Sequence, residues 1–401
     1  MSGGGVLFDP FLPEFIADPY PFYHRLREAE PVHRSPLGFW VLTRYDDCVT
    51  LLRDQRFGRA GFEGMLEAVY GEQREQGRLP TSMLFRDPPD HTRLRSLVSR
   101  AFTPRVIEGL RPRIRQIVDE LLDGVRAARQ MDVIAELAYP LPVTVICEML
   151  GVPVGDHASI KQWSSDIARS LDAIGLPSDL EIAERGREGR RQLGEYFRGL
   201  VPARRRQPRA DLLSLLIAAE EQGDKLSEGE LLATCVLLFI AGHETTVNLI
   251  GNGLVALLRH PEELERLRED PALIPSGVEE LLRYDGPVQR TARIAQVDVE
   301  LGGHMIEKGQ MVVALIGAAD RDPAHFAEPD RLDVGRRDNH HIAFGFGIHF
   351  CLGAPLARLE GQIALGTLLR RAPGLALGSD ALEWRESSVL RGLKALPVVW
   401  T

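Results

Sequence analysis

One long stretch without a helix breaker constrains the fold more than any other feature of the sequence. It begins at Ser227 and ends at Pro261. Ser227 can cap a helix N-terminus, and Glu230 can complete a capping box. The spacing predicts a rod of roughly 33 residues, about 50 Å long at about 1.5 Å per residue. A helix of that length must cross the whole molecule, so the rest of the chain has to pack around it.

The remaining sequence predicts a mainly α-helical protein with small β-sheets, an α+β class. A β-rich part covers about residues 1–60, with two strands around a turn at Leu37–Gly38. A helical core follows over about residues 90–286, and strands return over about residues 287–401. We expect these parts to form a single domain over residues 1–401.

The C-terminal part carries further local signals. Ser276 and Glu279 are expected to form a second capping box, at the start of the last helix before Pro287. Gly302–Gly303 predicts the turn of a hairpin. The closing stretch "SVLRGLKALPVVW" predicts a final hairpin.

Composition excludes several classes of protein. The chain has 401 residues, 44% of them hydrophobic, and a net charge of -9, which disfavours general nucleic-acid binding. The start "MSGGGVLFDPFLPEF" resembles neither a signal peptide nor an anchor. The most apolar run, Leu231 to Gly242, is far shorter than the roughly 20 residues of a membrane span. We therefore expect a cytoplasmic protein without a membrane anchor.

Three of the four cysteines, Cys48, Cys147 and Cys235, lie in apolar helical contexts typical of a core. No Cys-x-x-Cys pair is present, so a disulfide framework or a structural zinc site is not expected. Cys351 differs, because it lies in "HHIAFGFGIHFCLGAPLARLE" among glycines and phenylalanines, just before a predicted helix. A helix N-terminus favours a thiolate over a thiol, and a thiolate is a soft ligand that suits iron, among other metals.

The long helix contains "LLFIAGHETTVNL", in which polar residues interrupt an apolar stretch. Glu244 and Thr245 follow Gly242, where the missing side chain would leave room for a small molecule. An acid beside a hydroxyl is a plausible proton-delivery pair. The alternative is that Gly242 marks a helix–helix crossing and that Thr245 is bonded locally. The residues alone leave both interpretations open.

Two weaker pairs complete the set of candidates. Glu280 and Arg283 lie one helical turn apart and can form an ion pair, although most such pairs are exposed on the surface and contribute little to stability. His91 and Arg95 lie four residues apart on one helix face, an arrangement that suits a carboxylate or phosphate ligand. A solvated basic face is the alternative for the second pair.

Taken together and in this order, these segments resemble the cytochrome P-450 family of haem-thiolate monooxygenases, in its soluble bacterial form. "FGFGIHFCLG", Phe344 to Gly353, is similar to the haem-binding loop of that family, and "AGHETT" to its oxygen-activation motif. Glu280 and Arg283 resemble its structural ion pair, and Arg331 stands where a second arginine would join that glutamate. The resemblance implies the cytochrome P-450 fold, a triangular prism with a long central helix across the haem.

The resemblance also implies a cofactor, heme b (iron protoporphyrin IX), and roles around it. Cys351 would be the proximal thiolate and the metal ligand, with Phe344 shielding the sulfur and with Gly345 and Gly353 shaping the loop. The haem propionates would be held by four residues: His91, Arg95, Arg293 and His349. Ala241 to Thr245 would hold dioxygen, with Thr245 donating a hydrogen bond and Glu244 relaying protons.

By position in the family, the substrate cavity would be apolar. Its wall would include the loop from Phe62 to Phe85 and the residues Leu84, Leu238, Val288, Val389 and Leu390. Arg290 would be either a polar anchor or, as we expect, an outward-facing surface residue. The reaction would hydroxylate or epoxidise a natural product, terpenoid, steroid or fatty acid. Oxidative coupling or desaturation on the same scaffold, and a non-catalytic haem sensor, are the alternatives.

The implied partners are a ferredoxin or flavodoxin with its reductase, which would bring electrons ultimately from NAD(P)H. Seven arginines and one acid, Glu108, lie between Arg93 and Arg115. This basic stretch could dock an acidic redox protein, or it could be a solvated helix face. A monomer is expected.

Overall fold

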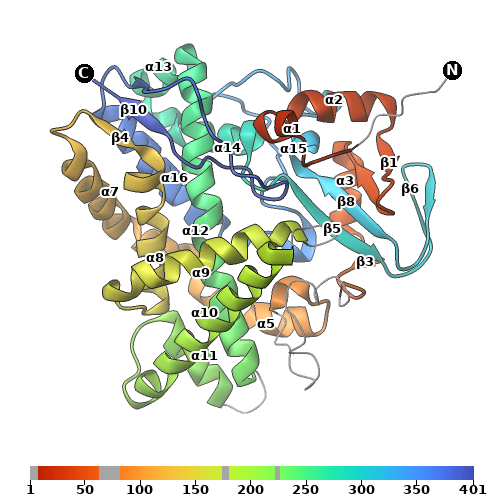
Figure 1. Ribbon diagram of the computed structural model, residues 1–401, viewed down its shortest axis with the longest axis horizontal. Helices are drawn as coiled ribbons and strands as arrows, with labels where there is room; N and C mark the ends of the chain where they lie inside the picture. Colours follow the sequence, from red (N-terminus) through yellow and green to blue (C-terminus); the bar gives the residue numbers. More distant parts are fainter. Residues whose placement is uncertain (1–7, 63–81, 174–179, 222–225) are drawn as a thin grey trace. The chain divides into compact units, whose positions relative to one another are not determined.

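The computed structural model describes residues 8–62, 82–173, 180–221 and 226–401 (Figure 1). Contacts between residues divide the chain into two compact units, each of which is described by itself. Unit 1 contains residues 1–58, 110–140 and 245–401, and unit 2 contains residues 59–109 and 141–244. The expectation of a single domain stays a prediction.

Helices dominate both units, as the sequence predicts. Those that lie wholly in unit 1 are α1 (Pro13–Ala17), α2 (Tyr20–Ala29), α3 (Tyr45–Arg53), α7 (Arg111–Val125), α13 (Pro261–Glu269), α14 (Ile274–Asp285), α15 (Ile316–Ala319) and α16 (Ala354–Arg371). Those of unit 2 include α5 (Asp90–Ser99), α6 (Pro104–Gly109), α8 (Pro140–Leu150, apart from Pro140), α9 (His157–Arg169), α10 (Leu180–Arg206) and α11 (Leu212–Glu221). The remaining long helix, α12, spans Glu228–Arg259 and contributes residues to both units.

The expected capping box of α12 is confirmed. The Ser227 amide donates to the Glu230 carboxylate at 2.8 Å, and the Glu230 amide donates back to Ser227 Oγ at 3.2 Å. Together these bonds satisfy two amides that a helix start would otherwise leave open. α12 is long and apolar enough to cross a membrane, but 67% of its most apolar window is buried inside the protein. That burial is typical of a core helix.

The second expected capping box is wrong. Helix α14 begins at Ile274, before Ser276, and the Ser276 hydroxyl donates to the Leu273 carbonyl at 3.0 Å. Ser276 therefore lies inside the first turn, which starts earlier because Pro275 fits the first positions of a helix. Glu279 is thus available for other contacts.

Unit 1 holds the sheets. The largest has the order β1-β2-β8-β5-β3, in which β2 and β8 are parallel and the other neighbours antiparallel. Its strands are β1 (Val32–Arg34), β2 (Trp40–Leu42), β8 (Met311–Leu315), β5 (Arg290–Ala295) and β3 (Phe57–Gly58). Apolar side chains of this sheet and of α3 form a common core, which includes Leu42, Cys48, Leu51 and Val312. The core fixes α3 against the sheet.

The smaller sheets confirm one prediction and correct another. β6 (Val299–Leu301) and β7 (His304–Ile306) form the expected hairpin, with positive φ at both Gly302 and Gly303. The final stretch folds back only in part, because Leu393 forms an isolated antiparallel bridge with Trp384, whereas the end of the stretch does not pair with it. Instead β10 (Pro397–Val399) pairs with β4 (Gln130–Asp132) and with β9 (Ala376–Leu377), so its partners lie far away in sequence.

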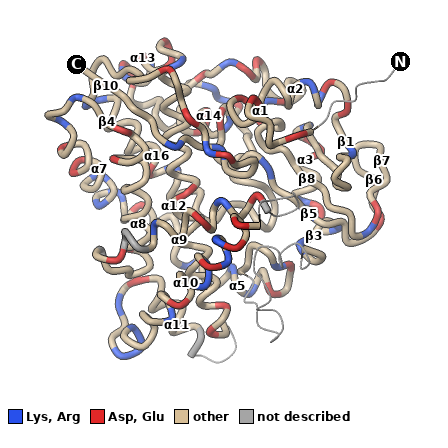
Figure 2. Tube along the Cα trace, viewed as in Figure 1, with Lys and Arg blue, Asp and Glu red and all other residues tan. Residues whose placement is uncertain are grey.

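Charged residues of both signs alternate along α10 in unit 2 (Figure 2). Arg191, for example, donates to Glu188 and to Glu195, one turn away on either side. Exposed pairs of this kind contribute little to stability, because water and salt screen their charges. They mark a solvated helix face.

Candidate functional site

The loop that carries Cys351 joins the segment after β8 to α16 and has the tight path that its glycines predict. Gly345 and Gly347 have φ of 72° and 71°, a region that strongly favours glycine. A Cβ on Gly347 would lie 2.5 Å from the Leu52 carbonyl oxygen of α3, so the loop touches that helix backbone. The Cys351 amide donates to the Phe344 carbonyl at 2.9 Å, which closes the loop.

Cys351 differs chemically from the other three cysteines. Burial raises the pKa of the Cys147 and Cys235 thiols to about 12, and it raises that of Cys48 well above the usual range. Cys351 is only partly buried and lies at the start of α16, whose N-cap is Gly353. The structure therefore supports Cys351, and not the buried cysteines, as a ligand.

The irregular segment before the loop is held by side chains that the sequence analysis did not single out. The Tyr45 hydroxyl donates to the His340 carbonyl at 2.6 Å, and the Ile342 amide donates to the Asp320 carboxylate at 2.7 Å. Burial raises the pKa of Asp320 to about 7. No local signal identifies these contacts, because the partners lie more than 20 residues apart in the chain.

Asp320 predicts a pH dependence of stability. Its folded pKa of about 7 lies above the ordinary 3.8, so between these values the folded state holds a proton that the unfolded state has lost. The free energy of unfolding therefore falls as the pH rises from about 4 towards 7, by up to about 1.4 kcal/mol per pH unit. The contribution of this group is fully present below about pH 4. We expect Asp320→Asn, which keeps an acceptor for Ile342, to flatten the slope of unfolding free energy between pH 5 and 7. Equal slopes in urea titrations would contradict this expectation.

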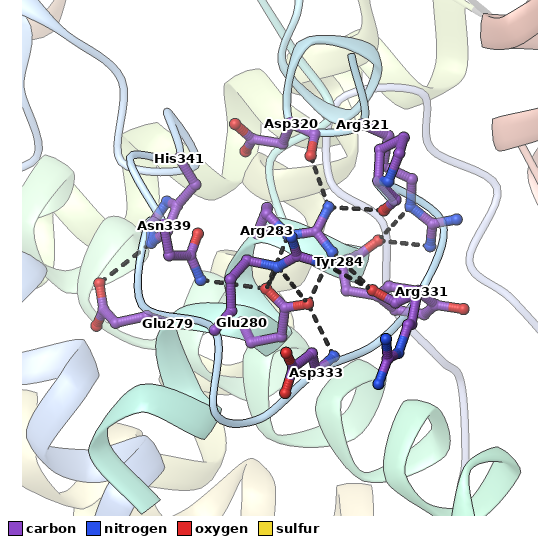
Figure 3. Close-up of polar contacts among 12 residues, drawn as sticks. Glu279, Glu280, Arg283, Tyr284, Asp320, Arg321, Arg331, Asp333, Asn339 and His341 are labelled. Atoms are coloured by element: carbon purple, nitrogen blue, oxygen red, sulfur yellow. Dashed lines mark hydrogen bonds and ion pairs between the residues drawn. The ribbon is translucent and has the colours of Figure 1, made fainter. Parts of the chain in front are cut away.

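Glu280 and Arg283 form a fully buried ion pair, and not a surface pair (Figure 3). Arg283 Nε and Nη2 each lie 2.7 Å from a carboxylate oxygen of Glu280. The remaining Arg283 hydrogens reach the carbonyls of Asp320, Pro329 and Arg331, so one side chain ties together the segment that leads to the Cys351 loop. This arrangement supports a structural role for the pair.

The second arginine on Glu280 is Arg336, and the assignment to Arg331 is wrong. Arg336 Nε lies 3.1 Å from Glu280 Oε2. The Arg331 side chain is exposed and pairs with Glu328. The segment has three arginines, at positions 331, 336 and 337, and only the path of the chain decides which of them reaches the buried carboxylate.

In α12, Glu244 and Thr245 are consecutive, with Glu244 buried and Thr245 partly buried. Glu244 Oε1 lies 3.5 Å from His243 Nε2, and His243 Nδ1 lies 2.7 Å from the Phe239 carbonyl. The space at Gly242 is not open to a small molecule on that side, because a Cβ there would lie 2.9 Å from Ile146 of α8. Gly242 is thus a helix-crossing residue, whereas the neighbouring Ala241 is exposed.

The residues expected to hold the haem propionates are divided between the two units. His91 and Arg95 lie one turn apart on α5, where His91 is buried and Arg95 partly buried. Arg293 is buried on β5, and His349 ends the short turn Gly347–His349. His91 and Arg95 belong to unit 2 and the other two residues to unit 1, so the convergence of all four on one cofactor stays a prediction.

Three of the expected substrate residues come together in unit 1. Val288 and Leu390 form an isolated β-bridge, and the Gln289 amide donates to the Val389 carbonyl at 2.9 Å. In unit 2, Leu84 lies in the turn Met83–Phe85, and Leu238 is a buried residue of α12. Most of the expected loop from Phe62 to Phe85 lies outside the described residues.

Arg290 is buried, so the expectation of an outward-facing surface residue is wrong. It lies at the start of β5, opposite Leu315 of β8, and its Nε donates to Ser388 Oγ at 3.0 Å. The reason is its position in a central strand of the largest sheet, which the sequence did not reveal.

Comparison with known proteins agrees with this geometry. Residues 38–372 match the family model "Cytochrome P450". The polyketide biosynthesis cytochrome P450 PksS of Bacillus subtilis (strain 168) is 43% identical, over 98% of each chain. The vitamin D(3) 25-hydroxylase of Pseudonocardia autotrophica is 44% identical, over 97% of this chain and 96% of its own. The crystal structure of myxobacterial cytochrome P450 CYP267B1 in complex with myristic acid matches with a TM-score of 0.90 and 46% identity, over 98% of each chain.

The chain therefore belongs to the cytochrome P450 family, and it is a cytochrome P450 monooxygenase with the fold of that family. The family implies a haem cofactor. The described residues fit such a group, because Cys351 is the partly buried soft donor in a glycine-shaped loop. The loop also exposes the apolar side chains of Phe346, Ile348 and Phe350, and exposed apolar patches mark binding surfaces. Thiolate-ligated haem supplies oxygen activation when bound.

Proposed function

We propose that this enzyme inserts one oxygen atom into an apolar small molecule, by hydroxylation or epoxidation. The observation that carries the proposal is the pairing of a buried acid with an adjacent hydroxyl, Glu244 with Thr245, in α12 beside the exposed Ala241. A non-catalytic haem sensor has no use for such a pair, whereas oxygen activation consumes two protons.

In this proposal each residue acts at a stated atom. Cys351 Sγ holds the iron, and Phe344 shields that sulfur. Thr245 Oγ1 donates a hydrogen bond at the oxygen-binding side and orients a water. Glu244 passes protons from solvent to that hydroxyl, and His243 Nε2 lies 3.5 Å from its carboxylate. Arg293 and His349, together with His91 and Arg95, would hold the propionates.

Replacing Thr245 with Ala tests the proton-delivery role. We expect product formed per reducing equivalent to fall roughly tenfold or more, with hydrogen peroxide released instead, because the methyl group cannot donate a proton. The measurement compares consumed NAD(P)H with product and peroxide. Thr234→Ala, which removes another buried hydroxyl of α12, is the control and should stay coupled. An unchanged product yield for Thr245→Ala would show that the role assigned to Thr245 is wrong.

The substrate is proposed to be a polyketide, terpenoid, steroid or fatty-acid derivative. Apolar side chains at Leu84, Leu238, Val288, Val389 and Leu390 support this class. So do the similar proteins, whose names include a polyketide enzyme, a vitamin D(3) hydroxylase and a complex with myristic acid. Binding is tested by the shift of the haem absorption band as each class is titrated.

Electrons are proposed to come from NAD(P)H through a ferredoxin or flavodoxin and its reductase, with the enzyme acting as a cytoplasmic monomer. The proposed docking surface uses the arginines of α7, of which Arg115 is exposed. Arg93 is less suited to docking, because it pairs with Glu230 at 2.5 Å and with Asp90 at 3.2 Å.

Charge reversal tests the docking surface. We expect Arg111→Glu with Arg113→Glu to slow reduction by a ferredoxin about tenfold or more at low salt, and to reduce its salt dependence, because steering depends on charge. The control is Arg206→Glu, at an exposed position of α10. Stopped-flow reduction that is insensitive both to salt and to these changes would rule out docking at α7.

A further inference from the structure

Phe344 opens the Cys351 loop, and a cation lies over its ring. Arg358 of α16 places its guanidinium carbon 4.5 Å from the Phe344 ring centroid. A guanidinium over an aromatic face is attracted by the negative charge of that face. The carbonyl of the same Phe344 accepts the Cys351 amide hydrogen at 2.9 Å. Arg358 thus contacts Phe344, the residue whose carbonyl accepts a hydrogen bond from the Cys351 backbone.

A single carboxylate holds Arg358 in this position. Arg358 Nε and Nη2 each lie 2.7 Å from a different oxygen of Glu279, in the bidentate arrangement that fixes both distance and orientation. The arginine side chain is 32% exposed and the glutamate 27%, so the pair is partly shielded from water. Burial raises the pKa of Glu279, but hydrogen bonds from His341 and Arg358 outweigh it and lower this pKa to about 2.

His341 is the second side chain that hydrogen-bonds the Glu279 carboxylate. Its Nδ1 accepts the Ala343 amide hydrogen at 3.2 Å, so the neutral ring carries its proton on Nε2. Nε2 lies 3.1 Å from Glu279 Oε2, and the ring centroid lies 5.9 Å from that of Phe344 (the Glu279–His341 contact is drawn in Figure 3). His341 and Arg358 therefore fix the carboxylate of Glu279 on α14, and Arg358 itself comes from α16, the helix that follows the Cys351 loop.

We propose that Glu279 and Arg358 are a balanced charge pair near the thiolate-ligated haem, in which each charge cancels the shift in reduction potential that the other would cause, with Arg358 as the positioning residue for Phe344. The proposal rests on Cys351 being the iron ligand. A positive charge near the haem favours the reduced iron, which carries one positive charge less, whereas a negative charge favours the oxidised iron. In the intact pair the two effects oppose each other, and removing either partner unbalances them.

Redox titration of the haem-loaded enzyme tests this pair. We expect Glu279→Gln, which leaves the guanidinium uncompensated, to shift the reduction equilibrium towards reduced iron by at least about threefold. We expect Arg358→Gln to shift it by a similar factor in the opposite direction. The double variant should lie close to the wild type. If the pair were only a structural brace, both single variants would shift the reduction equilibrium in the same direction. The shift of the double variant would then not return to the wild-type value.

Two controls separate charge from packing. Arg358→Lys keeps the charge and should stay near the wild-type equilibrium, and Arg331→Gln removes an exposed arginine and should have no effect. Shifts of the same sign in both single variants, or no shift in either, would overturn the charge pair. If Arg358→Gln does not take up haem, the redox titration of Glu279→Gln is the test. A shift of its reduction equilibrium towards reduced iron supports the charge pair, and any other result overturns it.

Failure of the ligand assignment can be recognised separately. If the wild-type enzyme lacks the red-shifted Soret band of reduced, carbon monoxide-bound thiolate haem, then Cys351 is not the ligand. If that band is present and the variants do not shift in opposite directions, the charge pair alone is wrong.

Discussion

Cys351→Ser should abolish the red-shifted Soret band that forms when the dithionite-reduced wild-type enzyme binds carbon monoxide. That band reports a thiolate bound to haem iron, and serine offers no soft sulfur donor. Cys351 is the cysteine that the loop leaves partly exposed at the start of α16. We therefore expect complete loss of the band and of monooxygenase activity.

The control for this experiment is Cys147→Ala. Cys147 is fully buried in α8, and its raised pKa keeps it a neutral thiol. This variant should lose some stability because it leaves a small cavity, but it should keep the band. A thiolate band that persists in Cys351→Ser would mean that another residue holds the iron, and the site would have to be reassigned.

Glu280→Gln should destabilise the enzyme by about 3–5 kcal/mol, because it leaves the Arg283 charge buried without its main partner. Both side chains are fully buried. The Glu280 carboxylate also accepts a hydrogen bond from Arg336 Nε. It accepts another from the Asp333 amide, at 3.0 Å (Figure 3). The measurement is urea-induced unfolding, followed by far-UV circular dichroism.

A matched control is Glu328→Gln, which breaks an exposed pair with Arg331. Its cost should stay below about 1 kcal/mol, as for most surface pairs. Glu280→Gln should also hasten loss of the thiolate band on mild heating, because Arg283 holds three carbonyls of the segment that leads to the loop. A cost for Glu280→Gln no larger than that of the control would contradict a bracing role.

The sequence was most informative where a feature is local. Ser227, Glu230 and Pro261 define the limits of α12, because capping bonds and helix breaking involve only neighbouring residues. Gly302 and Gly303 predict a hairpin because their positive φ is costly for other residues. The same applies to the Cys351 loop, whose glycine spacing and family resemblance both point to a thiolate site.

Tertiary structure decided every choice among distant partners. Arg336 reaches Glu280 and Arg331 does not, because the fold of residues 331–337 turns one toward the carboxylate and the other toward solvent. The last strand pairs with residues 130–132 instead of its own neighbours. Such contacts join segments far apart in the chain, so no local pattern encodes them. The sequence alone therefore determined the class of enzyme and predicted its cysteine ligand, whereas packing determined which charges lie beside Phe344, the residue whose carbonyl accepts the Cys351 amide hydrogen.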